Sequence, residues 1–337
     1  MSLSHQSFRA SVKPAPGGDG AAARAAGPGA GAGTQSLVGE RERTAREIEL
    51  RIERFPSLPS VVLEIERVAN DPGASVGDFE DAIRVDPVVT AKILRLANSA
   101  FYARARSVST IRDAVGALGV RTLRSLVMAA ASGGVMDRRL PAYGYEPDGL
   151  WKHSFAAALC CRAAASKMSS SERVQEEVFV AGLLHDIGKM VLDPLLEDVA
   201  AGSSGETSFR TPALEAERLG WSHARVGELI VAKWKLPPEI GEAIVHHHDP
   251  AAAPSCPLHV SVLVLANDFV KEAGIGLSAS GARDIERARE SARDGGDETG
   301  GRLPTSALHP AIATKLRQEL SAEIPQVRAL CEQLAGG

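Results

Sequence analysis

The sequence has little of several features that mark common protein classes. Of its 337 residues, four are cysteine and 4% are aromatic. Four scattered cysteines are too few for the disulfide framework of a small secreted domain, so we expect reduced, buried thiols. No stretch approaches the roughly 20 apolar residues that a membrane span requires, and the N-terminus lacks the apolar core of a secretory signal. These absences predict a cytoplasmic protein.

Excess positive charge is also missing. The 38 lysines and arginines are outnumbered by 42 acidic residues, which gives a net charge of −4. A strongly basic nucleic-acid binder or a polybasic membrane anchor would need the opposite balance. Arg112, Arg121 and Arg124 are therefore interpreted as solvated helix faces, with phosphate contact as the minor alternative. We expect neither DNA nor a membrane as a partner.

Apolar residues make up 44% of the chain, enough to bury a core in one large domain or two modest ones. Residues 14–34 are almost all Gly, Ala and Pro and cannot offset their ordering entropy. We predict these divisions: a disordered tail over 1–44, a main domain over 45–275 with lobes at 45–136 and 150–275, a flexible loop over 276–306 and a helical segment over 307–337.

Helix signals recur through the first lobe, and no run alternates apolar and polar residues at period two. The signals are the capping pairs Ser75 with Asp78 and Thr110 with Asp113, the N-cap and proline Asp86-Pro87, and a stop at Gly119. After a linker at 137–149, helical patterns are expected at 150–167, 173–187, 212–219, 222–235, 237–248 and 257–272. The fold class predicted from these patterns is all-α.

Histidines lie at positions that the helical pattern marks as inward. They are His153, His185 with Asp186 beside it, His223, His247 and His248, whereas His246 belongs to the solvent face. Burying imidazoles with a carboxylate costs free energy unless they pair or coordinate a metal. Such ligands suit Zn, Fe, Mn or Ni. Two such ions could activate a water for phosphoester displacement, with Lys189 facing the phosphate.

Each residue also has a simpler interpretation. A single inward histidine is more often a hydrogen-bonded core residue than a ligand, and Asp186 could cap a helix end. His5, His259, His309 and the cysteines are assigned structural roles for this reason. The order His, His-Asp, His and His-His on successive helices strengthens the metal-site interpretation until it balances the simpler one, while catalysis stays the weaker interpretation.

Over roughly residues 50–275 the sequence resembles the HDOD domain (HD-related output domain) family. The matching segments are FPSLPSVVLEIERVANDPGAS, IRVDPVVTAKILRLANSAFY, IRDAVGALGVRTLRSLV, LWKHSFAAALCC, VFVAGLLHDIGKMVL, LGWSHARVGELIVAKWKLPPEIGEAIVHHHDP and LANDFVKEAGIG. The resemblance implies a small helical bundle packed on a lobe similar to HD-superfamily metal-dependent phosphohydrolases. It also implies a bacterial signalling role, in a family where many members have lost the catalytic residues.

This chain keeps a ligand set similar to that of the HD-GYP cyclic-di-GMP phosphodiesterases but lacks their GYP segment. Asn267 stands where the resemblance places the closing aspartate, and Asp268 follows one residue later. We assign the closing metal position to Asp268, with Asn267 as the alternative. The expected cofactor is one or two divalent ions of Fe, Mn, Zn or Ni.

Two functions follow from these features. The first is a regulatory module that acts through contacts with signalling proteins, with a bound metal or nucleotide as ligand. The second is a metal-dependent phosphohydrolase acting on a nucleotide or cyclic dinucleotide, with Asp186 and Lys189 as its catalytic residues.

Overall fold

The structure is a computed structural model that describes residues 31–102, 107–201, 211–278 and 308–335. Within these ranges the regular elements are α-helices and two short 3₁₀ helices, and the one β-type contact is an isolated bridge between Leu140 and Tyr145. The all-α prediction is confirmed for the part of the chain described.

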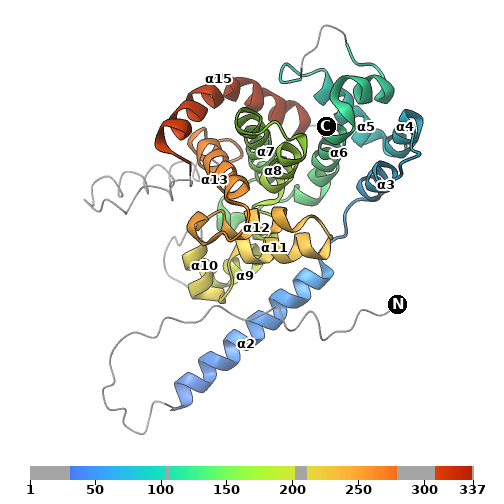
Figure 1. Ribbon diagram of the computed structural model, residues 1–337. Coiled ribbons are helices and arrows are strands. Elements are labelled where there is room, and N and C mark those ends of the chain that lie inside the picture. Colours follow the sequence, from blue (N-terminus) through green and yellow to red (C-terminus); the bar gives the residue numbers. More distant parts are fainter. Residues whose placement is uncertain (1–30, 103–106, 202–210, 279–307, 336–337) are drawn as a thin grey trace.

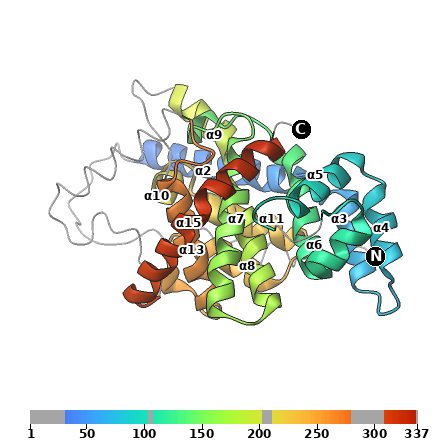
Figure 2. The ribbon, with the colours of Figure 1, turned by 90° about the horizontal axis from the view of Figure 1, so that it is seen from above.

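The first lobe lies at one side of the molecule (Figures 1 and 2). Its helices are α3 (Ser60–Ala69), α4 (Val76–Arg84), α5 (Pro87–Ala97) and α6 (Ile111–Met136). α6 packs against the other three and also against α8 (Glu172–Leu184) of the second lobe. Buried aliphatic side chains such as Ile65, Ile83 and Ile93 join these helices into one core.

The predicted helix starts and the predicted stop are confirmed. Ser75 and Asp78 form a capping box at the start of α4, and Asp86 accepts a hydrogen bond from the backbone N–H of Val89 at the start of α5. Gly119 has φ 77° and ψ 159°, which breaks the helical path inside α6. Glycine adopts a positive φ without steric cost, so the chain turns there.

Removing the cap of α6 gives a direct test of these local signals. Thr110 Oγ1 accepts from the backbone N–H of Asp113 at 3.0 Å, and Asp113 accepts from the N–H of Thr110 at 3.1 Å. We expect Thr110→Ala to lower the free energy of unfolding by about 1 kcal/mol in urea denaturation. Thr314→Ala, at an exposed position in the helix Pro310–Ala335, is the control and should have a smaller effect. Equal losses in the two variants would show that the capping box contributes nothing.

The second lobe holds the remaining core helices (Figure 1). They are α7 (Gly149–Met168), α8 (Glu172–Leu184), α9 (Lys189–Ala201), α10 (Pro212–Leu219), α11 (His223–Lys233), α12 (Pro238–His246) and α13 (Pro257–Glu272). α7 packs against α8 and α13, and α9 to α12 lie beside them. The prediction omitted α9, whose pattern is interrupted by Pro194. The bounds predicted for the other helices agree with the structure to within a few residues.

Two further helices lie on the outside. α2 (Gly31–Arg54) begins inside the tail expected to be disordered, and its C-terminal carbonyls at Ile52, Glu53 and Phe55 accept hydrogen bonds from Lys233 Nζ. An ammonium at these last carbonyls stabilises the C-terminal end of the helix. α15 (Pro310–Ala335) packs against α7, α13 and α5. Residues 1–30 and 279–307 lie outside the described residues, and the predicted domain boundaries stay predictions.

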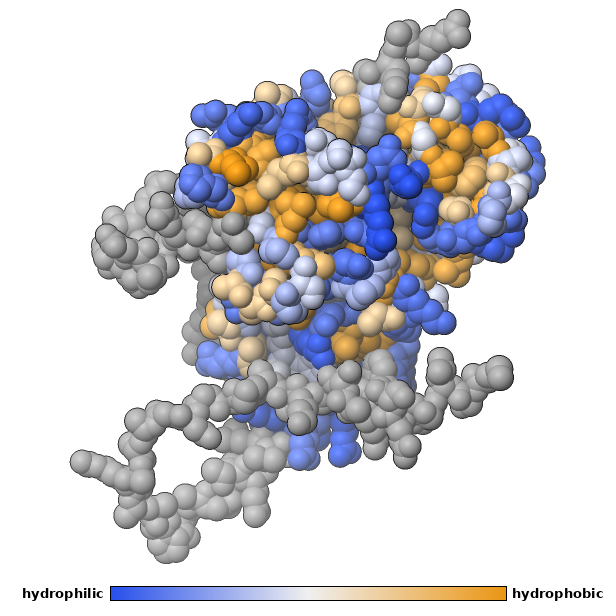
Figure 3. All heavy atoms as spheres, viewed as in Figure 1, coloured by the Kyte–Doolittle hydropathy of each residue, from blue (hydrophilic) through white to orange (hydrophobic). Residues whose placement is uncertain are grey.

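By length and mean hydropathy alone, α6 is the one described helix that could cross a membrane, where we expected none. Half of its most apolar window is buried within the protein. The apolar character of α6 is therefore equally well explained by its place in the core. Figure 3 shows hydrophobic and hydrophilic residues mixed over the visible face, with hydrophobic patches over the first lobe at the upper right.

Candidate metal centre

The candidate ligands come from the ends and inner faces of four helices in the second lobe. His153 lies in α7, His185 and Asp186 follow α8, His223 begins α11, and His247 and His248 follow the last turn of α12. Gly188 makes this approach feasible, because a Cβ at that position would collide with the backbone carbonyl of His223. The turn after α8 therefore places Asp186 directly against the start of α11.

Asp186 lies between two sets of imidazoles and faces one with each carboxylate oxygen. Oδ2 is 3.3 Å from His185 Nε2 and 3.7 Å from His153 Nε2. Oδ1 is 3.3 Å from His223 Nε2 and 3.9 Å from His247 Nε2. The aspartate is fully buried. A carboxylate in this position is suited to bridge two cations.

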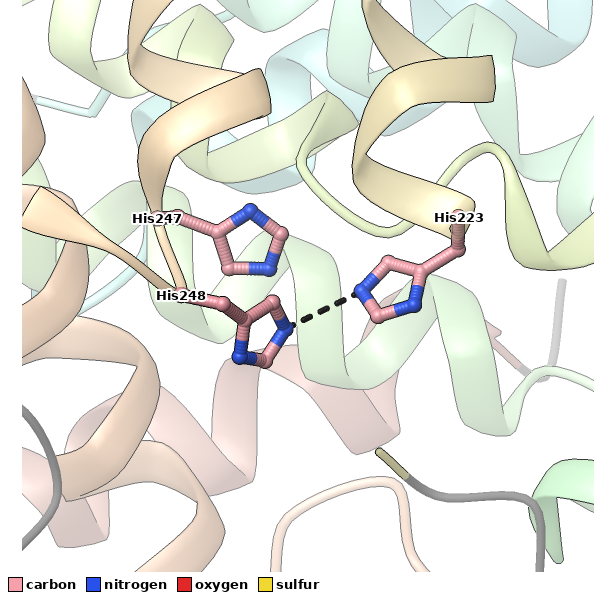
Figure 4. A group of neighbouring side chains, drawn as sticks. All are labelled: His223, His247 and His248. Carbon is pink, nitrogen blue, oxygen red and sulfur yellow. Dashed lines mark hydrogen bonds between the residues drawn. The ribbon is translucent and has the colours of Figure 1, made fainter. Parts of the chain in front are cut away.

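The ligand atoms gather into two groups, each within 4.8 Å. One group is His153, His185 and Asp186, and the other is His223, His247 and His248. Figure 4 shows the second group: the rings from α11 and from the end of α12 point toward one another, and His248 Nε2 lies 3.1 Å from His223 Nε2. Asp186 connects the two groups through the contacts given above.

Hydrogen bonds on the far side of two rings leave their inner nitrogens facing the centre. Nδ1–H of His185 donates to the carbonyl of Gly182 at 2.8 Å, and Nδ1–H of His247 donates to that of Ile244 at 2.6 Å. Their Nε2 atoms and Asp186 Oδ1 are buried and have no hydrogen-bond partner. Buried polar atoms without partners cost free energy, and a metal ion would satisfy all three. The donor set therefore fits a divalent metal.

Glu215 orients His223, and the sequence analysis missed it. Its Oε1 accepts from His223 Nδ1–H at 2.7 Å, and its Oε2 accepts from the backbone N–H of His223 at 2.6 Å. Both side chains are fully buried. A carboxylate behind a metal-binding imidazole fixes the ring and makes it a stronger ligand. The available signal was its spacing of four from Leu219, which places Glu215 on the buried face of α10.

The charges of the centre suit metal binding. Burial lowers the pKa of His153, His247 and His248 well below the usual value, so these rings are neutral at pH 7. Burial alone would raise the pKa of Asp186, but His185 and Lys189 hold it well below its usual value. Burial opposes the charge of Lys189, yet Asp186 raises the pKa of this ammonium, and their atoms lie 2.6 Å apart.

The two candidates for the closing position, Asn267 and Asp268, lie differently around the centre, and the assignment of a metal ligand to Asp268 stays a prediction. Asn267 Oδ1 lies 3.1 Å from His153 Nε2. Asp268, the residue we had assigned, is buried but belongs to neither ligand group. Consecutive residues of a helix point about 100° apart, so α13 presents only one of the two to the centre. The residue presented is an uncharged amide.

The segment expected to be a linker, 137–149, covers the centre. The bridge between Leu140 and Tyr145 closes a short loop that contains the 3₁₀ helix η1 (Pro141–Tyr143). Lys189 Nζ lies 5.3 Å from the ring centre of Tyr143 and 5.4 Å from that of Tyr145. Both tyrosines are buried. The loop thus encloses the lysine and separates the centre from solvent.

Asp193 on α9 anchors this loop, and its titration should affect stability. Its Oδ1 accepts from the backbone N–H of Ala142 at 3.0 Å. Burial and the nearby Glu197 raise the pKa of Asp193 to about 7. The folded state therefore favours the protonated carboxyl, and this contribution to stability is lost as the pH rises from about 4 through 7.

Asp193→Asn removes that dependence while keeping an acceptor for Ala142. We expect the variant to be more stable than the parent. This difference in the free energy of unfolding should be about 1 kcal/mol larger at pH 8 than at pH 5. Thermal denaturation at the two pH values measures the difference. The exposed Asp81 provides the control variant Asp81→Asn. A gain that does not change with pH would contradict the assigned titration.

Comparison with known proteins places this geometry in a family. The HDOD domain profile matches residues 55–250. An HDOD domain protein of unknown function from Geobacter sulfurreducens is 26% identical, with a TM-score of 0.63, and the match covers 88% of this chain and 99% of that one. A protein of Shewanella amazonensis SB2B, provisionally described as a phosphohydrolase, is 27% identical, with a TM-score of 0.62 and coverage of 86% and 98%.

A curated relative, an uncharacterized protein of Treponema pallidum (strain Nichols), is 26% identical over 234 residues. The match covers 68% of this chain but only 44% of the relative, so the chain spans less than half of that protein. The profile match, which extends from Phe55 to just past α12, includes the first lobe, the second lobe up to but not including α13, and every histidine of the centre. The chain therefore belongs to the HDOD domain family.

Proposed function

We propose that this chain is a regulatory module that binds divalent metal in its second lobe and transmits a signal through contacts with other proteins. The observation that carries the proposal is the burial of the candidate ligand cluster. His153, His185, Asp186 and His223 are fully buried, and His247 is 2% exposed. A cluster of this kind can hold an ion but offers a substrate little access.

The ligands of such an ion would be the two groups that Asp186 joins, with Glu215 behind His223. One or two ions of Fe, Mn, Zn or Ni suit imidazole and carboxylate ligands. A bound ion would connect the ends of α8 and α12 with the first turns of α7 and α11, because the candidate ligands lie there. The chain's own contribution is to hold neutral imidazoles and an ionised aspartate in place before the ion arrives.

Three features of the centre disfavour turnover. Tyr143 and Tyr145 enclose Lys189, the residue expected to face a phosphate. The ammonium of Lys189 already occupies Oδ2 of Asp186 at 2.6 Å. Asn267 brings no charge to the closing position. The signalling partners we propose are proteins, since the net charge of −4 does not favour nucleic acid.

The second candidate function is a metal-dependent phosphohydrolase with a nucleotide or cyclic dinucleotide as substrate. It is favoured by the position of Asp186 between two ligand groups, an arrangement that suits a two-metal displacement. The similarity to the Shewanella protein described provisionally as a phosphohydrolase points the same way. In this function Asp186 would bridge the ions and Lys189 would contact the phosphate.

An activity assay separates the two functions. Protein loaded with Mn or Fe is tested on bis(p-nitrophenyl) phosphate and on cyclic di-GMP, with Asp186→Asn as the matched control. We expect no hydrolysis above that of the control. Metal-dependent turnover by the parent that disappears in Asp186→Asn would replace the regulatory proposal with the phosphohydrolase.

A further inference from the structure

A cavity lies away from the metal centre, where the two lobes meet. Its volume is about 300 Å³, within the range of small-molecule sites. Residues from α5, α6, the start of α7 and the end of α15 line it. A ligand in this cavity would contact both lobes at once.

The cavity contains a buried lysine that lacks an ion partner. Lys92 on α5 is only 9% exposed, and no described residue forms a hydrogen bond or ion pair with its Nζ. Its one polar contact is with the ring of Trp151, whose centre lies 5.9 Å away. Gly133 leaves room for the ammonium, because a Cβ there would lie 3.4 Å from Lys92 Nζ. Asp148 attracts this ammonium electrostatically but forms no direct ion pair with it, so an anionic ligand group could still contact Lys92 directly and recover part of the cost of its burial.

Two carboxylates on the same wall supply the opposite charge. Asp137 and Asp148 both line the cavity, and burial together with Asp137 raises the pKa of Asp148. Asp148 has a φ of 62°, in the left-handed region that non-glycine residues rarely adopt, and its side chain does not cap α7. Asp148 therefore does not perform the capping role that aspartate usually has at the start of a helix.

The remaining lining is small and apolar. Ala130, Ala131 and Gly134 leave space beside the charged groups, and Val88, Val89 and Leu334 add aliphatic surface. A multiply charged anion would be repelled by the two aspartates, and a simple cation would leave Lys92 without a partner. A molecule with one anionic group, one ammonium group and an aliphatic part matches the whole lining.

We propose that this cavity binds a free α-amino acid with an aliphatic side chain. The carboxylate would pair with Lys92, the amine with Asp137 and Asp148, and the side chain would pack on the valines of α5. Because α5 and α6 belong to one lobe and α7 to the other, the ligand would fix the lobes together. The cavity would then be a ligand input that is separate from the metal centre.

Isothermal titration calorimetry on the full chain tests this proposal with L-leucine and L-valine as probes. We expect saturable binding of at least one of them. N-acetyl-L-leucine, which lacks the ammonium, and L-leucinamide, which lacks the carboxylate, should each bind at least tenfold more weakly. Lys92→Met should weaken binding at least tenfold and retain the fold, since methionine preserves the volume. Lys315→Met, on the exposed face of α15, should bind as the parent does.

Several results would overturn the proposal. These are the absence of binding by both amino acids, equal binding of the blocked analogues, or unchanged affinity in Lys92→Met. Preferential binding of inorganic phosphate or AMP would identify an anion site instead and would equally contradict it. If Lys92→Met does not fold, Asp148→Asn gives the same test through the amine, with at least tenfold weaker binding expected.

Discussion

Asp186→Ala should lower the free energy of unfolding of the metal-free protein by about 3–5 kcal/mol, because it leaves a buried lysine without its counter-ion. Lys189 is 6% exposed and its Nζ lies 2.6 Å from Asp186 Oδ2, while the aspartate itself is fully buried. The aromatic rings of Tyr143 and Tyr145 offer the ammonium only weak compensation.

A double-mutant cycle separates this charge effect from lost packing. Lys189→Met in the Asp186→Ala background removes the unpaired charge and should recover most of the lost stability. Urea denaturation, with a chelator present throughout, gives the free energy of unfolding of the parent, of each single variant and of the double variant. The exposed ion pair of Arg84 and Asp81 is the matched control. Breaking it should lower the free energy of unfolding by less than about 1 kcal/mol, because ion pairs on the surface contribute little to stability. No recovery in the double variant would show that the pair is not the source of the loss.

Glu215→Gln should weaken metal binding about 10- to 100-fold without unfolding the protein. Glu215 accepts from both Nδ1–H and the backbone N–H of His223, so its charge strengthens the opposite nitrogen as a ligand. Glutamine has nearly the same shape and keeps one acceptor, but it brings no negative charge. Competition against a fluorescent chelator reports the affinity directly.

The chain contains its own control for this experiment. Glu177 and His259 form another buried pair, with Oε2 3.0 Å from Nε2, outside both ligand groups. Glu177→Gln should therefore leave metal affinity unchanged while perturbing a similar contact. Equal losses in the two variants would mean that the effect is on general stability rather than on His223.

Local signals explain why so much of the fold was predictable. Capping boxes at Ser75 and Thr110 and the stop at Gly119 act within one helical turn, so the sequence carries them directly. The inward histidines were found because helical spacing places them with apolar neighbours. α9 was not predicted because Pro194 stands inside it, where a proline usually ends a helix. Its burial depends on contacts with other helices, which the local sequence does not reveal.

The rest of the centre depends on contacts between distant segments. Glu215 reaches His223 because α10 packs beside the start of α11, and Tyr145 covers Lys189 through a loop that has the composition of a linker. The choice between Asn267 and Asp268 depends on the rotation of α13 about its axis. Helical periodicity does not specify that rotation to within one residue.

The most direct test of the central claim is the metal content of the full chain. Plasma mass spectrometry is applied to protein purified without chelators or a histidine tag, with Asp186→Asn alongside. The cluster of histidines around Asp186 predicts one or two divalent ions per chain in the parent and none in the variant. Parent protein that stays free of metal after reconstitution with Mn, Fe, Zn and Ni would contradict the account.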